Sequence, residues 1–291
     1  MITLSEHALE RAGQRLVVSE AGGGARSWTV DGVELLASFP NGTRDAAFAG
    51  KPLVPWPNRL RDGHYTFEGR EHRVVITEPE TRTALHGLTL ASQWRASQTS
   101  PYAITLTHQL RDRDGYPFAL DLAVGYELDA GGIVVTLQAT NAGAGRAPVG
   151  AGLHPYLRVG GDVTLQVAAR TRVPVDDRLL PTGPPTAVSA TDLDFRAARR
   201  LGEQRLDTCF GDLERGPEGV ASVTLTDGAR RIVVWMDDAF HFVQVFTAAG
   251  AIAVEPMTCA PDAFNTGDGL LVLEPGASFT GRCGLSASGY P

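Results

Sequence analysis

Five polar residues in this sequence combine side chains suited to moving a proton with side chains suited to holding a polar ligand. They are spread along the chain: Arg59 in PWPNR, His86 in LHG, His154 in GLHPY, Asp207 in LDTCF and Glu255 in VEPM. An imidazole and a carboxylate can exchange protons with a substrate near neutral pH. A guanidinium can donate in a fork to neighbouring hydroxyls or to a carboxylate. Together these types indicate acid–base chemistry on a hydroxyl-rich molecule.

Glu255 is expected at the end of a strand. Alternation over residues 252–255 places Ile252 and Val254 on one face and Ala253 and Glu255 on the other. Pro256 lacks a ladder donor, which predicts that the strand ends there. A carboxylate in this position is costly to bury unless it is paired or used. The alternative is an exposed glutamate without a role, which is the commoner case for a glutamate taken alone.

The two histidines lie at glycine-containing bends. His154 follows Gly150 and Gly152, and His86 precedes Gly87. Glycine allows sharp turns and a close approach of the backbone to a ligand. Each histidine is therefore a candidate for proton transfer, and each is also compatible with a core position in which both ring nitrogens are satisfied.

Arg59 and Asp207 are candidates for ligand binding. Arg59 follows the stiff segment Pro-Trp-Pro, which fixes the direction of the arginine, and Trp56 within it offers a flat apolar face. Asp207 can accept hydrogen bonds from hydroxyls or cap a turn. A tryptophan in the core or at the surface remains the alternative for Trp56.

Other chemistries fit the sequence less well. His86 and His154 are zinc-type ligands, but neither belongs to an HxH or HExxH pattern, so no metal site is predicted. Asp207 and Glu255 are the two residue types of a glycosidase pair, whose separation the sequence does not give. GxSxG, P-loop and GxGxxG elements are absent from the positions where a strand–turn–helix would require them.

The elements that carry these residues are predicted to be strands. Apolar and polar residues alternate over 102–110, 120–128, 163–167 and 279–285, and denser apolar runs at 232–236 and 270–273 predict strands buried on both faces. Asn-Gly and Asp-Gly pairs, which favour turns, lie between these segments. Only residues 6–12 and 197–206 have a helical pattern. We expect an all-β sandwich or barrel with only short helices, in one domain over residues 1–291, with 181–185 (PTGPP) in a long loop.

Composition limits the partners and the compartment. The formal net charge is -7 and the sequence pI is about 5.5, which disfavours a nucleic-acid partner. The apolar runs are too short to span a membrane, and no secretory signal is visible near the N-terminus. Three widely spaced cysteines without a CxxC pattern favour a reducing, cytoplasmic location.

The blocks PWPNRLRDGHYTF, LHG, DGYPF, GLHPY, VDDRLLPTG, LDTCF and VEPMTCAPDAFN, in this order, resemble the aldose 1-epimerase (galactose mutarotase) family. The resemblance implies a large antiparallel β-sandwich, the galactose mutarotase-like supersandwich, and a small sugar as substrate. It implies Glu255 as catalytic base, His154 as catalytic acid, and Arg59, His86 and Asp207 as ligands of the sugar hydroxyls. It implies neither a cofactor nor a metal, and it leaves the oligomeric state open.

Three other functions are compatible with the same residues. A hexose-phosphate epimerase on this fold would need clustered cations, for which Arg59, Arg61 and Arg82 are the candidates. A sugar-binding module without catalysis would keep the binding residues and Trp56 but would not need both Glu255 and His154. A purely structural sandwich would leave the polar residues unexplained. The PWPNR and EPMTCAPDAFN forms resemble a bacterial branch of the family, so the preferred sugar is open.

Overall fold

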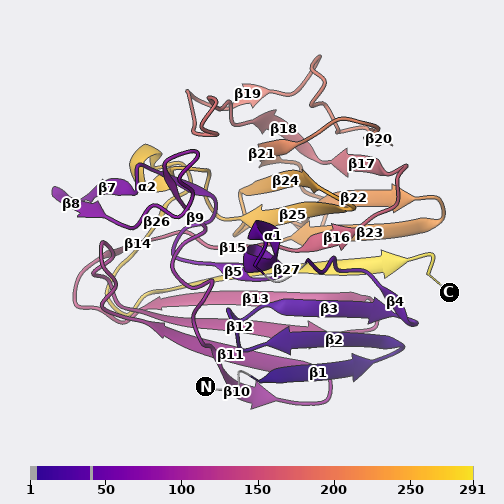
Figure 1. Cartoon of the computed structure of the whole chain (residues 1–291), viewed down its shortest axis with the longest axis horizontal. Helices are drawn as coiled ribbons and strands as arrows, with labels where there is room; N and C mark the ends of the chain where they lie inside the picture. Colours follow the sequence, from indigo (N-terminus) through magenta and orange to yellow (C-terminus); the bar gives the residue numbers. More distant parts are fainter. Residues whose placement is uncertain (1–4, 40–41, 291) are drawn as a thin grey trace.

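The computed structural model describes residues 5–39 and 42–290, and its architecture is β-sheet throughout (Figure 1). Neighbouring strands of the two largest sheets pair antiparallel. The larger sheet has nine strands, in the order β10 (Arg95–Thr99), β11 (Ala103–Leu110), β12 (Leu120–Leu128), β13 (Gly132–Asn141), β27 (Ser278–Ser288), β23 (Arg230–Met236), β22 (Ala221–Asp227), β17 (Thr164–Val167) and β20 (Arg199–Arg200).

The second sheet has eight strands and carries much of the chemistry described below. Its order is β19 (Thr186–Ala187), β18 (Ala169–Arg172), β21 (Asp207–Leu213), β24 (Phe242–Ala248), β25 (Ala251–Met257), β15 (Gly152–Leu153) and β5 (Pro52–Leu53), with β16 (Tyr156–Arg158) also paired to β25.

Smaller sheets and two short helices complete the structure. A four-stranded sheet, β1 (Glu6–Arg11), β2 (Gln14–Ser19), β3 (Ala25–Val30) and β4 (Val33–Glu34), lies alongside β11 to β13 (Figure 1). The two-stranded sheets are β6 (Arg59–Arg61) with β9 (Thr83–Leu85), β7 (His64–Phe67) with β8 (Arg70–Arg73), and β14 (Ala147–Val149) with β26 (Leu271–Leu273). The helices are α1 (Arg44–Phe48) and α2 (Ala263–Thr266).

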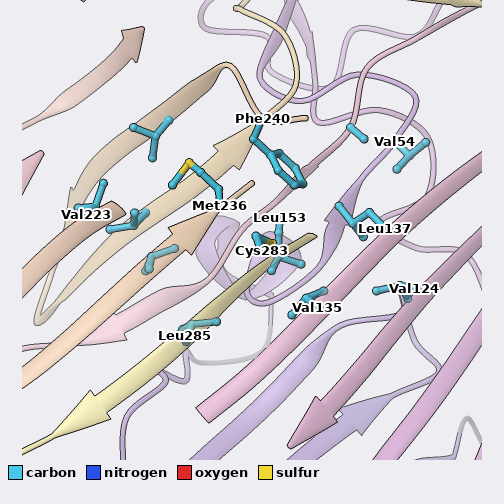
Figure 2. Packing of buried hydrophobic residues seen from close by; sticks show 14 of the residues in the cluster. Val54, Val124, Val135, Leu137, Leu153, Val223, Met236, Phe240, Cys283 and Leu285 are labelled. Carbon is cyan, nitrogen blue, oxygen red and sulfur yellow. The ribbon is translucent and has the colours of Figure 1, made fainter. Parts of the chain in front are cut away.

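The hydrophobic core lies between the sheets, as the predicted alternation requires. Along β12 every second residue is buried, and Val124 on this strand packs in the same cluster as Val135, Leu137 and Leu285 (Figure 2). Residues from the other sheet, including Val254, belong to that cluster as well. The two largest sheets therefore share one core, and the polar face of β25 is directed away from it.

Both helices predicted from the sequence are strands or loops instead. Residues 6–11 form β1, which pairs with β2 across a two-residue turn in which Ala12 and Gly13 have φ of 50° and 77°. Within 197–206 only Arg199–Arg200 is regular, and it pairs with β17. Gly202, with φ of 58°, follows in a turn. Cross-strand pairing outweighed weak local helix propensity in both segments.

Two strands predicted to be buried on both faces are buried on one. Val233 and Trp235 of β23 are half-buried on the outer face of the sheet, and Val272 of β26 is 37% exposed. Strand β26 has only β14 as a partner, and in β23 the apolar side chains cover small neighbours such as Gly284. Residues 181–185 lie in the predicted loop, between β18 and β19.

Cys209, Cys259 and Cys283 are free and buried. Across residues 5–39 and 42–290, no helix is long and apolar enough to cross a membrane.

Candidate active site

The fold brings all five predicted site residues to one cavity. They come from five places: Arg59 begins β6, His86 follows β9, His154 lies between β15 and β16, Asp207 begins β21 and Glu255 is within β25. The cavity is lined by Arg44, Asp45, Phe48, Asn58, Arg59, Leu85, His86, His154, Tyr156, Asp207, Gln244, Phe246 and Glu255. The sandwich therefore assembles residues that are almost 200 positions apart in the chain.

Glu255 and His154 form a buried pair. His154 Nε2 lies 3.3 Å from Glu255 Oε1, and both side chains are 3% exposed. The predicted faces are confirmed, since Ile252 and Val254 join the core whereas Ala253 packs with the cavity residue Tyr156. The predicted strand end is wrong. Strand β25 continues to Met257, and it accommodates Pro256 because this residue lies opposite the break between β15, which pairs at Met257, and β16, whose pairing begins at Ala253.

Burial pushes both members of the pair toward their uncharged forms. It raises the pKa of Glu255 well above its ordinary value, and the neighbouring carboxylate of Asp207 adds to this. Burial lowers the pKa of His154 to about 3. His154 Nδ1 and Glu255 Oε2 have no hydrogen-bond partner in the described protein. The 3.3 Å contact is short enough for a proton to pass between the two groups, and Nδ1 of His154 and Oε2 of Glu255 retain unused bonding capacity.

His86 is fixed as a hydrogen-bond donor. The ring Nδ1 accepts a hydrogen bond from the backbone N–H of Asn58 at 3.1 Å. The backbone N–H of His86 donates to the carbonyl of Asn58 at 2.9 Å. Because Nδ1 is an acceptor, the neutral ring carries its proton on Nε2. The ring lies edge-on to His154, 4.9 Å between centroids, and burial lowers the pKa of His86 well below its ordinary value. His86 therefore presents a neutral N–H group.

Arg59 is held by a carboxylate that sequence reasoning missed. Its Nε and one terminal nitrogen donate to Glu78 at 2.7 and 3.2 Å, and the same terminal nitrogen lies 3.7 Å from a carboxylate oxygen of Asp207. Thr81 and Thr83 also donate to Glu78. The arginine and these hydrogen bonds lower the pKa of Glu78 to about 2 even though burial opposes the shift. Glu78 precedes a proline in an ordinary-looking segment, so no motif marked it.

Gln244, Tyr156 and Asp45 were also missed. Gln244 is the cross-strand partner of Glu255, donates to Asp207 and has a buried Oε1 without a partner. Tyr156 stacks on His154 at 4.7 Å and donates to Asp45 at 2.8 Å. Tyr156 lies two residues after His154, a spacing that could have identified it. Gln244 could be found only from the strand register.

Residues proposed for other roles lie elsewhere. Trp56 is buried, donates to the carbonyl of Ala84 at 3.2 Å and packs edge-on against Phe264, so it is a core residue. Arg61 pairs with Asp262 at 3.1 Å. Arg82 pairs with Asp62 at 3.2 Å and is 70% exposed. The phosphate-binding cluster of Arg59, Arg61 and Arg82 is therefore not assembled at the cavity.

Donor atoms of His86, His154 and Glu255 lie within 4.8 Å of one another. Nitrogen ligands bind zinc at about 2.0–2.1 Å, which brings neighbouring ligand atoms in a tetrahedral site to roughly 3.4 Å. These three residues would hold a metal only after the side chains draw together. The uncharged proton-sharing arrangement already accounts for the His154–Glu255 contact.

Comparison with known proteins identifies the family. The sequence model described as aldose 1-epimerase matches residues 6–286. The chain belongs to the aldose 1-epimerase family. It is 33% identical to the uncharacterized Escherichia coli K12 protein YihR over 264 residues, covering 88% of this chain and 84% of YihR. It is 29% identical to human galactose mutarotase over 170 residues, covering 52% of this chain and 46% of that protein.

Solved structures confirm the predicted fold. The aldose epimerase homologue from C. elegans superimposes with a TM-score of 0.86 at 18% identity, over 98% of this chain and 99% of that one. A galactose mutarotase-like protein from Clostridium acetobutylicum gives 0.85 at 16% identity, over 98% of both chains. This aldose 1-epimerase family member thus has the galactose mutarotase-like sandwich.

Proposed function

We propose that this protein is an aldose 1-epimerase that interconverts the α and β anomers of a hexose or related aldose. The observation that carries the proposal is the buried contact between His154 Nε2 and Glu255 Oε1, 3.3 Å apart, in the cavity that Arg59, His86 and Asp207 also line. Anomer exchange needs a base at the C1 hydroxyl and an acid at the ring oxygen. Membership of the aldose 1-epimerase family supports the same reaction.

The two roles follow from the resting state of the pair. Glu255 is the proposed base and His154 the proposed acid. Shifting the shared proton from Glu255 to His154 produces a carboxylate and an imidazolium without taking a proton from solvent. The carboxylate then removes the C1 hydroxyl proton while the imidazolium protonates the ring oxygen, which opens the ring. Rotation about C1–C2 and closure with reversed roles gives the other anomer.

The remaining polar groups are suited to holding the ring and leaving C1 free. The Nε2–H of His86 and the guanidinium of Arg59 donate, whereas Asp207 and the unpartnered Oε1 of Gln244 accept. A fixed ring converts proton transfer into a reaction between positioned groups, which lowers the entropic part of the barrier. The scheme contains no redox change and no group transfer, so it requires no cofactor.

The charges of the cavity favour a neutral sugar over a sugar phosphate. Arg59 is engaged by Glu78 and Asp207, and Arg44 also pairs with Glu78. A phosphate would have to displace these carboxylates from both arginines. A binding module without catalysis would have no need for a buried pair at Glu255, whose desolvation is costly.

We propose further that residues 1–291 act as one domain and that the protein resides in the cytoplasm. Strand β13 pairs with the C-terminal strand β27, and the cavity draws on residues from Arg44 to Glu255, which supports one folding unit. Three free, buried thiols are typical of a reducing compartment.

Replacing Glu255 by Gln tests the function. The amide keeps the shape but removes the base, so the enzymatic anomerisation rate should fall by about 10²–10⁴-fold. NMR exchange between the anomeric protons of glucose and galactose measures that rate. Glu274→Gln, at an exposed glutamate, is the matched control and should retain the parent rate. A folded Glu255→Gln protein that exchanges anomers like the parent would remove Glu255 from the mechanism.

A further inference from the structure

The proposed reaction places a positive charge on His154 in a buried position. When the proton passes from Glu255 to His154, an imidazolium forms on a side chain that is only 3% exposed. Burial disfavours this charged form and lowers the pKa of His154 to about 3. A neighbouring group that stabilises the imidazolium would therefore raise the share of the pair that is ready to protonate the ring oxygen of the sugar.

Tyr156 presents a ring face to this imidazole. The two rings are stacked, with 4.7 Å between their centroids and 20° between their planes. The face of an aromatic ring carries partial negative charge and attracts a cation that lies within about 6 Å of the ring centre. Phe48 also stacks on His154, at 5.8 Å, but it is only half-buried and belongs to a helix without buried residues, whereas Tyr156 is 2% exposed. Tyr156 is therefore the fixed face.

The fold holds the ring of Tyr156 in this position. Tyr156 begins β16 and pairs with Ala253 of β25. Alanines pack around the phenol, and the ring of Phe39 meets it edge-on at 4.7 Å. Its hydroxyl donates to Asp45 at 2.8 Å. The phenol is thus fixed at its backbone, its ring and its hydroxyl, which keeps its face against His154.

The hydroxyl increases the negative charge on that face. Burial raises the pKa of Tyr156 well above its ordinary value, and the hydrogen bond to Asp45 adds to this, so the phenol remains a neutral O–H donor. A hydrogen bond donated to a carboxylate polarises the O–H bond and leaves more electron density on the oxygen and the ring. Tyr156 is accordingly unsuited to exchanging a proton itself, and it can act only through His154.

We propose that Tyr156 is a positioning residue for anomer exchange, whose ring face orients the imidazole of His154 and stabilises its imidazolium form. This inference rests on the proposed function and adds to its mechanism. The attraction is stronger when His154 carries the proton than when it is neutral. Loss of the face should therefore lower kcat without a matching rise in KM.

Two substitutions separate the ring face from the hydroxyl. Tyr156→Phe keeps the face, and NMR exchange of glucose and galactose anomers should show kcat within about threefold of the parent. Tyr156→Leu removes the face, and kcat should fall by about 10–30-fold with KM within twofold. Phe39→Leu is the matched control, since it removes a ring that contacts Tyr156 at 4.7 Å, and it should keep the parent kcat. Thermal melts establish that the variants are folded.

Fluorinated phenylalanines at position 156 test the electrostatic origin of the effect. Fluorine withdraws electron density from the ring face and changes the shape of the ring little. From phenylalanine through the 4-fluoro and 3,5-difluoro to the 3,4,5-trifluoro analogue, kcat should fall stepwise, by about tenfold in total. The same series at position 39 should leave kcat level. A ring that only fills space at position 156 would give level rates as well.

The outcomes separate this role from the proposed function. A parental kcat in Tyr156→Leu, or level rates along the fluorinated series at position 156, overturns the role of Tyr156 and leaves the function intact. If the parent anomerises no sugar, the proposed function fails, and NMR titration of the ¹³C-labelled imidazole of His154 decides the inference. It then stands only if protonation of His154 moves to lower pH along the fluorinated series, and an unchanged His154 resonance overturns it.

Discussion

Replacing His154 by Gln should change how stability depends on pH. Burial lowers the pKa of His154 from 6.5 to about 3. Between these values the unfolded chain binds a proton at His154 that the native protein does not, so the free energy of unfolding falls as the pH drops below 6.5. At pH 5 this linkage corresponds to about 2 kcal/mol, and at pH 7.5 it is close to zero.

Urea unfolding at pH 7.5 and pH 5.0 measures the effect. The parent should lose about 2 kcal/mol more between the two pH values than His154→Gln, which has no titrating group at this position. Glu255 and His86 are present in both proteins, so their own linkage largely cancels in the comparison. His241→Gln, at an exposed histidine, should follow the parent.

Equal losses for the parent and His154→Gln would refute this reasoning. Equal losses would mean that the pKa of native His154 stays at its unfolded value. A smaller loss in the parent than in His154→Gln would mean that native His154 already carries a proton at pH 7.5 and faces Glu255 as an imidazolium–carboxylate pair. The attraction between the two charged side chains would then outweigh the cost of burying their charges. The test therefore reports which form of the pair is at rest.

Three other substitutions and one change of conditions have definite expectations. Arg59→Ala should lower stability by about 3–5 kcal/mol in urea, because it removes the buried cation beside Glu78 and leaves that buried carboxylate with the exposed Arg44, and adding Glu78→Gln should restore part of the loss. Asp207→Asn should raise KM for the sugar more than it lowers kcat, which steady-state polarimetry would show, and an unchanged KM would exclude Asp207 from the binding set. Leu137→Ala should cost about 2–5 kcal/mol with anomer exchange preserved. Anomer exchange should be unaffected by EDTA, and loss reversed by zinc would instead assign a metal to His86, His154 and Glu255.

Sequence reasoning predicted the strands and selected five residues that the fold brings to one cavity, because both leave local signals. The period-two alternation of the sequence over 120–128 matches the structure, in which every second residue of β12 is buried. The site residues lie in recognisable blocks. The residues that support them leave no such signal. Glu78 contributes through a hydrogen-bond network, and Gln244 is next to Glu255 only because β24 pairs with β25 in one register.

The helical predictions failed for a related reason. Residues 6–11 are an edge strand whose outward face is polar, so spacing alone does not separate a short helix from a short strand. The turn at Ala12 and Gly13 determines the outcome, since two consecutive residues with positive φ close a tight hairpin. Pro256 also gave a wrong strand end for β25: it pairs with Val243 of β24, and on its other side it lies at the break between β15 and β16.

The PWPN and LHG segments are best understood as one structural unit. Asn58 and His86 both have left-handed backbones, with φ of 57° and 61°, which is costly for residues other than glycine. Each donates its backbone N–H to the other, Asn58 to the imidazole Nδ1 and His86 to the Asn58 carbonyl. These bonds compensate for the strain and fix the tautomer that directs the Nε2–H into the cavity. Arg59 begins its strand immediately after this bridge, so the same geometry that orients the histidine also places the guanidinium against Glu78 and Asp207. Each left-handed conformation is therefore stabilised by a hydrogen bond to the other residue.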